Sequence, residues 1–243
     1  MTMKFILITG ASGDIGTACA IKLAEAGYSL YCHYYQNESK ITSLVNQLIN
    51  DFPNQEFLAI QADLSQEEGV DTVFTSLFQL DGIIFAHGDT LYDLFTDHSS
   101  QELDNMWHTH LKSPMRICQK SQSKLSHCQS GRIIFISSIY GLVGSSMEVL
   151  YSTLKGGQIA FANAFSKEVA SLGITVNTIA PGAVNTRMNQ DWTEPEKNEI
   201  LESIPLNRMA DPAEIASLAC FLLSSEASYI TGVTLPVTGG WKI

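Results

Sequence analysis

The sequence predicts an α/β protein whose single domain carries a doubly wound, parallel, seven-stranded sheet with helices on both faces. Short apolar runs alternate with amphipathic segments of helical length along the whole chain, which is typical of a parallel sheet. The first apolar run ends in a glycine-rich turn, and polar residues follow several later runs. We therefore expect a Rossmann fold over residues 1–243, with a ligand site beyond the carboxyl ends of the strands.

Composition narrows the class of protein. The 243 residues are 45% hydrophobic and 16% charged, which indicates a globular chain with a substantial core. The net charge of −11 disfavours nucleic acids and anionic membranes as partners, because both attract clustered Lys and Arg. No apolar run approaches the roughly 20 residues of a membrane helix, and no leader precedes the first strand. We expect a cytoplasmic protein.

The cysteines give no sign of a metal site or a disulfide framework. They are odd in number and widely spaced, without a C-x-x-C pair. We interpret them as reduced residues that lie mostly in the core, and we predict no metal. The five positions are Cys19, Cys32, Cys118, Cys128 and Cys220.

The first strand is predicted at 4–9, and a glycine-rich turn follows it over 10–16. Apolar residues at helical spacing then run from Ile15 to Ala26. Backbone N–H groups at the start of such a helix, together with its dipole, bind phosphate, and glycines allow a close approach. The turn therefore predicts a dinucleotide site, although an ordinary strand-to-helix turn would have the same sequence pattern.

The second strand is predicted at 28–34, and its end indicates which nicotinamide cofactor binds. An acidic residue at this point would bond the adenosine ribose and select NAD. The chain has no acid there before Glu38, which disfavours NAD. The nearest cation is Lys40, and no Arg stands in the turn. We therefore expect NADPH.

The remaining elements alternate in the same way. Further strands are predicted at 56–61, 82–86, 132–136, 174–179 and 233–237. Further helices are predicted at 38–51, from near 65, at 99–125 with a kink at Pro114, through Tyr151 and Lys155 to about 171, and at 212–223. The polar segment 185–208 is long for a loop, and we interpret it as a candidate mobile lid.

Polar residues follow the predicted strands at the edge where a ligand would bind. They are Asp63, His87-Gly88, Ser138 and Pro181-Gly182, together with the glycine-rich turn. An acid at Asp63 can accept a hydrogen bond from an adenine amine, or it can cap the helix that begins near Ser65. Five separate segments therefore converge on one edge of the sheet.

Tyr151 and Lys155 are the candidate reacting groups. Residues at i and i+4 share a helix face, so an ammonium would lie beside a phenol. We expect the ammonium to lower the pKa of the phenol from about 10, so that it gives a proton to a carbonyl oxygen near neutral pH. The Ser138 hydroxyl would stabilise the charge that develops on that oxygen.

These motifs, in this order and spacing, resemble the short-chain dehydrogenase/reductase family over nearly the whole chain. The matching positions are Thr9-Gly10 with Gly16, Asp63-Leu64, Ser138, Tyr151 with Lys155, Asn177, Pro181-Gly182 with Thr186, Tyr229 to Gly232, and Gly239-Gly240-Trp241. The resemblance implies a nicotinamide-dependent reductase and a homotetramer. It implies Tyr151 as the general acid, Lys155 on the nicotinamide ribose, Ser138 on the carbonyl oxygen and Thr186 on the cofactor carboxamide.

The cofactor-binding residues that we predict share one property: they lie in or next to these motifs. The set is Gly10, Ser12, Gly13, Asp14, Ile15, Gly16, Asp63, Leu64, His87, Gly88, Tyr151, Lys155, Pro181, Gly182, Val184 and Thr186.

Three positions depart from the family pattern. Asp14 stands where the family usually has Gly, and we interpret it as a helix cap that faces away from the cofactor. His87 lies in place of an Asn-containing turn, and we interpret it as structural. His110 replaces the Asn that holds a proton-relaying water, and imidazole can relay protons itself, so we include it among the candidate catalytic residues.

Two substrates remain open within this resemblance. Ile204-Pro205-Leu206-x-Arg208 is typical of 3-oxoacyl-acyl carrier protein reductases, but the basic residues that dock an acidic carrier are missing at 127–130 and 172. A related branch reduces the 5-aminopentanone on elongation factor P and resembles this chain at 30–34, at His110 and at the Gly-Gly-Trp ending. A second alternative is a module that binds NADP without catalysis, which the missing relay Asn suggests.

Overall fold

The computed structural model describes residues 3–127, 130–190 and 192–241. Seven parallel strands form one sheet in these residues, in the order β3-β2-β1-β4-β5-β6-β7. The strands are β1 (Phe5–Thr9), β2 (Ser29–Tyr34), β3 (Phe57–Gln61), β4 (Gly82–Phe85), β5 (Arg132–Ile136), β6 (Thr175–Pro181) and β7 (Thr234–Val237). The predicted doubly wound Rossmann fold is confirmed.

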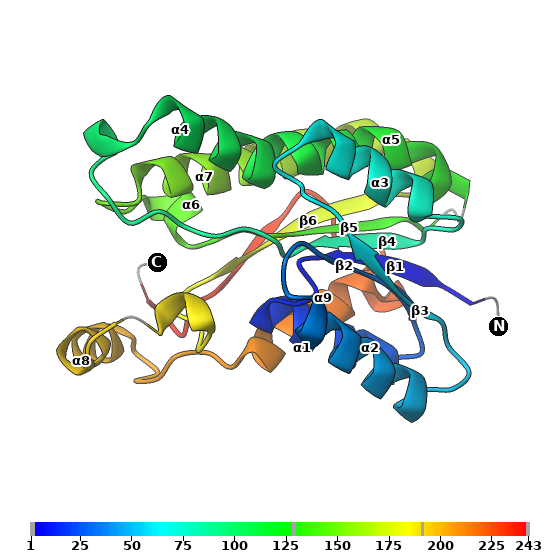
Figure 1. The fold of residues 1–243 in the computed structure, drawn as a ribbon, viewed down its shortest axis with the longest axis horizontal. Coiled ribbons are helices and arrows are strands. Elements are labelled where there is room, and N and C mark those ends of the chain that lie inside the picture. Colours follow the sequence, from blue (N-terminus) through cyan, green and yellow to red (C-terminus); the bar gives the residue numbers. More distant parts are fainter. Residues whose placement is uncertain (1–2, 128–129, 191, 242–243) are drawn as a thin grey trace.

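Helices cover both faces of the sheet (Figure 1). One layer holds α1 (Asp14–Glu25), α2 (Glu38–Asp51) and α9 (Pro212–Leu223), whose apolar faces join one core cluster. The other holds α3 (Glu67–Ser76), α5 (Ser113–His127) and α7 (Val149–Val169), which pack in a second cluster. The central strands are buried on both faces, which is why they read as continuous apolar runs.

Most of the predicted boundaries are confirmed to within a residue or two. The helix α2, the strand β5 and the helix α9 match the predicted ranges. Strand β6 extends two residues further, because Pro181 still pairs with Val237 of β7. Two predictions, for 99–125 and for 185–208, were wrong in detail.

The predicted single long helix at 99–125 is three segments: α4 (Ser100–Trp107), a π-helical stretch (His108–Lys112) and α5. The irregularity precedes Pro114 because proline has no N–H to give to the carbonyl of His110, four residues earlier. That carbonyl instead accepts a hydrogen bond of 2.6 Å from Gln158 Nε2 on α7. Pro114 thus frees His110 to be anchored to the helix that carries Tyr151.

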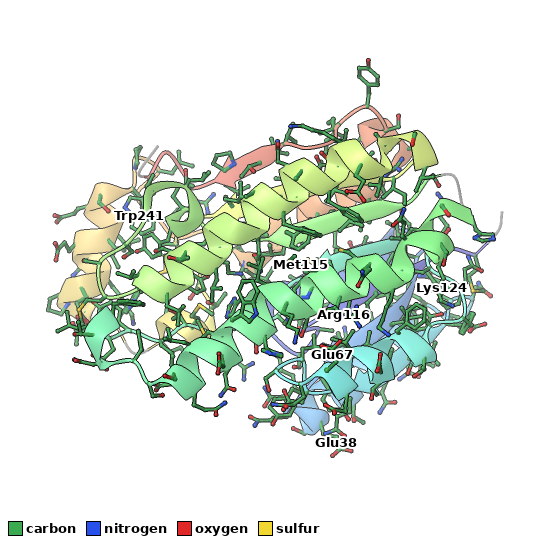
Figure 2. The ribbon with its side chains drawn as sticks, turned by 90° about the horizontal axis from the view of Figure 1, so that it is seen from above. Glu38, Glu67, Met115, Arg116, Lys124 and Trp241 are labelled. Carbon is green, nitrogen blue, oxygen red and sulfur yellow. The ribbon has the colours of Figure 1, made fainter. Side chains whose placement is uncertain are left out.

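The segment 185–208 is not a simple loop. It contains a 3-10 turn (Arg187–Asn189) and the helix α8 (Glu194–Ser203), which begins with a capping box between Thr193 and Glu196 and a proline in its first turn. This start signal is visible in the sequence. Trp192 packs in a small apolar cluster with Ile139 and Trp241, so this segment is packed against the body of the fold. Figure 2 shows Trp241 on that side of the molecule.

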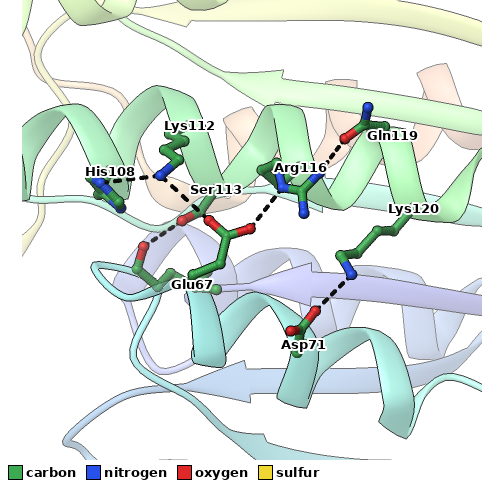
Figure 3. Close-up of polar contacts among 9 residues, drawn as sticks. Glu67, Asp71, His108, Lys112, Ser113, Arg116, Gln119 and Lys120 are labelled. Carbon is green, nitrogen blue, oxygen red and sulfur yellow. Dashed lines mark hydrogen bonds and ion pairs between the residues drawn. The ribbon is translucent and has the colours of Figure 1, made fainter.

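Ion pairs join α3 to α5 on the outer surface (Figure 3). Glu67 pairs with Arg116 at 2.7 Å and with Lys112 at 3.5 Å, and Asp71 pairs with Lys120 at 2.7 Å. Most of these side chains are a third or more exposed, so each pair contributes little stability. Arg116 and Lys120 of α5, and Lys112 just before it, are therefore bound by carboxylates of α3.

Cys19, Cys32 and Cys118 are free and buried, as predicted for reduced core residues, and Cys220 is partly buried. Burial raises the pKa of the Cys19 and Cys32 thiols to about 12, so they are inert at neutral pH. Cys128 lies outside the described residues. Within the part of the chain that the structure describes, no helix has the length and apolar character needed to cross a membrane.

A stability test of the fold concerns Gly69 in α3. A Cβ at this position would lie 1.9 Å from the carbonyl oxygen of Asp63, which is backbone and cannot move aside cheaply. We expect Gly69→Ala to lower the free energy of unfolding by about 1–3 kcal/mol, the range for overpacked sites, in urea titrations. Glu68→Ala, on the exposed neighbour in the same helix, is the control and should change little. Equal stability of the two variants would contradict this packing.

Candidate functional site

A cavity of about 570 Å³ opens at the carboxyl edge of the sheet, at the β1/β4 point where the strand order reverses. Loops after four strands contribute to its wall, together with α4 and the segment after β6. The lining residues are Gly10, Ser12, Gly13, His33, Tyr35, Gln36, Asn37, Asp63, Leu64, Ser65, Ala86, His87, Gly88, Asp89, Leu91, Glu102, Asn105, Met106, Thr109 and Arg187.

Glycines let the loop after β1 pass close to its neighbours. Gly10 has a φ of +71°, and a Cβ there would lie 2.6 Å from the Cα of His87. A Cβ on Gly16 would lie 2.2 Å from the Gly10 carbonyl oxygen. No side chain caps α1, whose N-cap is Gly13. Open backbone N–H groups and the helix dipole therefore fit a phosphate group at this loop.

Asp14 is the first helical residue of α1 and is not its cap, which corrects the prediction. Its carboxylate accepts hydrogen bonds from Lys40 Nζ and from the backbone N of Arg187, both at 2.8 Å. Partial burial raises the pKa of Asp14, but the hydrogen bonds from Arg187 and Lys40 outweigh it and hold the pKa below its usual value. Two cations thus offset the negative charge beside the loop.

His33, at the end of β2, fixes the same loop from the other side. Its Nδ1 accepts a hydrogen bond from the backbone N–H of Gly10 at 3.1 Å, and its Nε2 lies 3.1 Å from the carbonyl oxygen of Ala62. This pattern fits a neutral ring protonated on Nε2. Burial lowers the pKa of His33 to about 4. His33 was not among the predicted site residues, although it lies at the end of β2, where a ribose-binding acid would stand.

His87 is structural, in agreement with its interpretation. Its Nδ1 lies 2.6 Å from Thr9 Oγ1, and its Nε2 lies 2.8 Å from the carbonyl oxygen of Thr109. Burial and the neighbouring His33 and His110 hold the pKa of His87 well below 6.5. The neutral ring therefore joins β1 to the π-helical stretch, and both nitrogens are occupied.

Ser138, Tyr151 and Lys155 come together as predicted, next to the cavity. Ser138 follows β5, and Tyr151 and Lys155 lie one turn apart in α7, all three nearly buried. Ser138 hydrogen-bonds the Tyr151 phenol. Lys155 Nζ donates to the Ile136 carbonyl oxygen at 2.9 Å and lies 5.5 Å from the centre of the Tyr151 ring.

The expected lowering of the Tyr151 pKa is wrong for this structure. Burial raises the pKa of the phenol well above 10, and the hydrogen bond from Ser138 only partly offsets this. Burial also lowers the pKa of Lys155 to about 7, while nearby Asp89 raises it. The physical reason is the same for both groups, since a buried site disfavours either charge. The phenol therefore stays protonated, which is the form that donates a proton.

His110 lies in the π-helical stretch and is fully buried. Neither ring nitrogen has a hydrogen-bond partner among the described residues. Its Nε2 lies 3.6 Å from Oδ1 of Asp89, and its ring packs edge-on against the Tyr151 ring at 5.7 Å. Burial lowers the pKa of His110, and Asp89 raises it again in part. The imidazole is neutral and positioned beside the two groups of α7.

The cavity unites only part of the predicted cofactor set. Its lining includes Gly10, Ser12 and Gly13 of the glycine-rich loop, Asp63-Leu64 and His87-Gly88. The predicted residues outside this lining are Asp14, Ile15, Gly16, Tyr151, Lys155, Pro181, Gly182, Val184 and Thr186, and Ser138 lies outside it as well. Asp63 does not cap α3, which starts at Glu67; its Oδ1 accepts hydrogen bonds from the N and Oγ of Ser65. Arg187 and Asp89 were not predicted, although each directly follows a predicted site residue, Thr186 and Gly88. Their side-chain partners, Asp14 and His110, become apparent only in the folded chain.

A family model described as enoyl-(acyl carrier protein) reductase matches residues 10–242. The chain is 43% identical over 240 residues to an uncharacterized oxidoreductase, YmfI, of Bacillus subtilis, with 98% of each chain covered. It is 34% identical over 241 residues to the 3-oxoacyl-[acyl-carrier-protein] reductase FabG of Staphylococcus epidermidis, again with 98% of each covered.

Two solved structures share the fold, each with a TM-score of 0.92 and 25% identity. One is YwfH, an NADPH-dependent reductase involved in bacilysin biosynthesis, and 98% of each chain is covered. The other is a blue fluorescent protein from a metagenomic library in complex with NADPH, with 99% of this chain and 98% of that one covered.

The neutral state of His33 predicts a pH-dependent stability. Its pKa is about 4 in the folded chain and 6.5 when exposed, so the unfolded chain binds more protons between these values. Stability is therefore full above pH 6.5 and falls toward pH 4, by about 3 kcal/mol for a shift of this size. Urea titrations between pH 7.5 and 4.5 measure this loss.

The matched variants are His33→Asn and His127→Asn. Asn at position 33 makes the protein less stable at pH 7.5, since the bond to Ala62 is lost. Because it does not titrate, it should reduce the pH dependence in this window to the part that buried His87 and His110 contribute. His127 is exposed at the end of α5, and its variant should keep the slope of the parent. An unchanged slope in His33→Asn would show that the ring is not held neutral.

Proposed function

The chain belongs to the short-chain dehydrogenase/reductase family and is an NAD(P)-dependent oxidoreductase, and from that premise we propose that it uses NADPH to reduce a ketone to a secondary alcohol. The observation that carries the proposal is the geometry of Tyr151, whose buried phenol lies beside Ser138 and one helical turn from Lys155. A proton donor of this kind beside a dinucleotide loop suits carbonyl reduction. We treat residues 1–243 as one domain, acting in the cytoplasm.

The cofactor proposal rests on the cavity and on the two NADPH-linked relatives in structure. The glycine-rich loop and the N-terminus of α1 would hold the diphosphate, and Asp63 would meet the adenine. The turn after β2 offers Tyr35, Gln36 and Asn37 to the cavity and no acid before Glu38, which suits a phosphorylated ribose better than a free diol. Pro181, Gly182, Val184 and Thr186 would meet the nicotinamide end.

When bound, NADPH supplies the hydride that reduces the carbonyl carbon. Tyr151 gives the proton to the carbonyl oxygen, and its raised pKa makes the phenol the form present at the start of each turnover. Ser138 holds the same oxygen by its hydroxyl and so stabilises the charge that develops there. Lys155, with a pKa near 7, exchanges protons readily at neutral pH and returns one to the phenolate.

Two ketone substrates fit this site. The first is a 3-oxoacyl group on acyl carrier protein, the substrate named for the FabG relatives. The second is the 5-aminopentanone on elongation factor P, which the charges of the cavity favour. Besides Asp63, which is assigned to the adenine, its lining holds the acids Asp89 and Glu102, which would attract an aminated substrate. A homotetramer stays a prediction from the family resemblance.

The general acid is tested with Tyr151→Phe. We expect NADPH consumption with a ketone to fall at least about 10²-fold, because phenylalanine fills the same space without the proton. NADPH binding, followed by cofactor fluorescence, should remain within a factor of a few. Tyr229→Phe, on a fully exposed ring, is the control and should keep full activity. Turnover retained in Tyr151→Phe would remove this residue from the mechanism.

The substrate is tested by comparing two protein-bound ketones. Acetoacetyl-carrier protein and aminopentanone-bearing elongation factor P are supplied at equal concentrations, and kcat/KM is measured for each from NADPH absorbance. Turnover of the first supports the carrier-protein proposal, and turnover of the second supports the aminated substrate. If neither is reduced while a small ketone is, both specific substrates fail and the general reductase function stands.

A further inference from the structure

The loop after β4 brings an exposed carboxylate against the buried imidazole of His110. Oδ1 of Asp89 lies 3.6 Å from Nε2 of His110, and the Asp89 side chain is 78% exposed whereas His110 is fully buried. This distance exceeds a hydrogen bond, but a side chain so open to solvent can close it by a small rotation. Asp89 also lines the cavity. One pair of side chains thus reaches from solvent to the interior.

Gly88 makes this approach possible. It has a φ of +134°, and a Cβ there would lie 2.4 Å from Cε1 of His110 and 2.9–3.0 Å from both ring nitrogens. The backbone therefore passes against the edge of the ring that carries its nitrogens, and only glycine leaves room for it. Both nitrogens lack partners among the described residues, so the ring has its full capacity to accept and to donate.

The inner end of this pair faces the reacting groups of α7. The carbonyl of His110 is bound by Gln158, three residues after Lys155, which fixes the π-helical stretch to that helix. The His110 ring contacts Tyr151, and charges on Lys155, Asp89 and His110 influence one another's pKa values. Neutral His87 is the other titratable neighbour. A buried polar ring without a hydrogen bond costs stability, which suggests a role in the reaction.

We propose that Asp89 is the solvent-side end of a proton path that runs through His110 to Lys155 and Tyr151. This inference rests on the proposed reductase function. For each ketone reduced, Tyr151 gives one proton to the oxygen and recovers it from the Lys155 ammonium. His110, protonated at Nδ1, then passes that proton to the Lys155 amine as its Nε2 takes another from Asp89, which regains its proton from solvent. Proton exchange returns the ring to its first tautomer before the next turnover. One proton enters from solvent per turnover, and the cofactor hydride carries the electrons.

The pair is tested first without turnover. The ¹⁵N NMR spectrum of the histidine-labelled protein reports the tautomer and titration of His110, whose signals are identified by their loss in His110→Asn. We expect a neutral ring in the parent and a lower pKa of His110 in Asp89→Asn, because the neighbouring anion is gone. Asp93→Asn removes an exposed acid of the same loop and should leave these signals unchanged.

The relay is tested next by kinetics. We expect Asp89→Asn to lower kcat by roughly tenfold, less than the loss of about 10²-fold or more for a direct proton donor. The KM values for NADPH and ketone should stay near those of the parent. Acetate or another small acid, added at constant pH and ionic strength, should restore kcat, because it supplies protons at an exposed position. Asp93→Asn should show neither the loss nor the rescue.

Four results would overturn the path. They are a His110 titration that ignores Asp89→Asn, an unchanged kcat in that variant, a loss of kcat that no added acid restores, and a loss seen only as a higher KM for the ketone, which would make Asp89 a substrate-binding group. If Tyr151→Phe still abolishes turnover, each of these four results refutes the proton path and leaves the reductase proposal standing. If the parent consumes no NADPH with any ketone, the path falls together with the reductase proposal.

Discussion

The close approach of the loops after β1 and β4 is the constraint on which the rest of the site depends. The backbone of Gly10 meets that of His87 at a distance that leaves no room for a Cβ. A hydrogen bond from the Gly10 N–H to His33 and another between Thr9 and His87 hold this crossing in place, and both rings are neutral. The position of the cavity, of the N-terminus of α1 and of the loop carrying Asp89 all follow from it.

Charge at the site is arranged in local pairs, which reconciles a net charge of −11 with an anionic cofactor. Asp14 would repel a diphosphate, but Lys40 and Arg187 bind its carboxylate from two other segments. Arg187 also donates to the carbonyl of Ser12, so a cation lies over the glycine-rich loop. On the outer face the reverse holds, since carboxylates of α3 bind Arg116 and Lys120 of α5 and Lys112 just before it, which reduces the positive charge available to an acidic carrier.

The sequence was a good guide wherever a local pattern determines the structure. Buried parallel strands are continuous apolar runs, so β5 and its neighbours were placed closely, and Ser138, Tyr151 and Lys155 were brought together as expected. The start of α8 was missed although Thr193 and Glu196 signal it. Arg187 could not be found in this way, because its contact with Asp14, more than a hundred residues earlier, depends on the complete fold. Asp89 follows the predicted Gly88, but its approach to His110 depends on how the loop after β4 packs on the π-helical stretch.

The Tyr151 pKa shows that the spacing of two residues in a motif does not by itself determine their protonation states. Spacing alone suggests that an ammonium lowers the pKa of the phenol, but burial raises it and lowers that of Lys155 toward neutrality. Burial therefore separates the reacting phenol from the solvent that must reprotonate it. The proposed path through His110 and Asp89 would connect this phenol to solvent. It uses a ring in the π-helical stretch, which Gln158 binds to α7, and a carboxylate in the loop after β4.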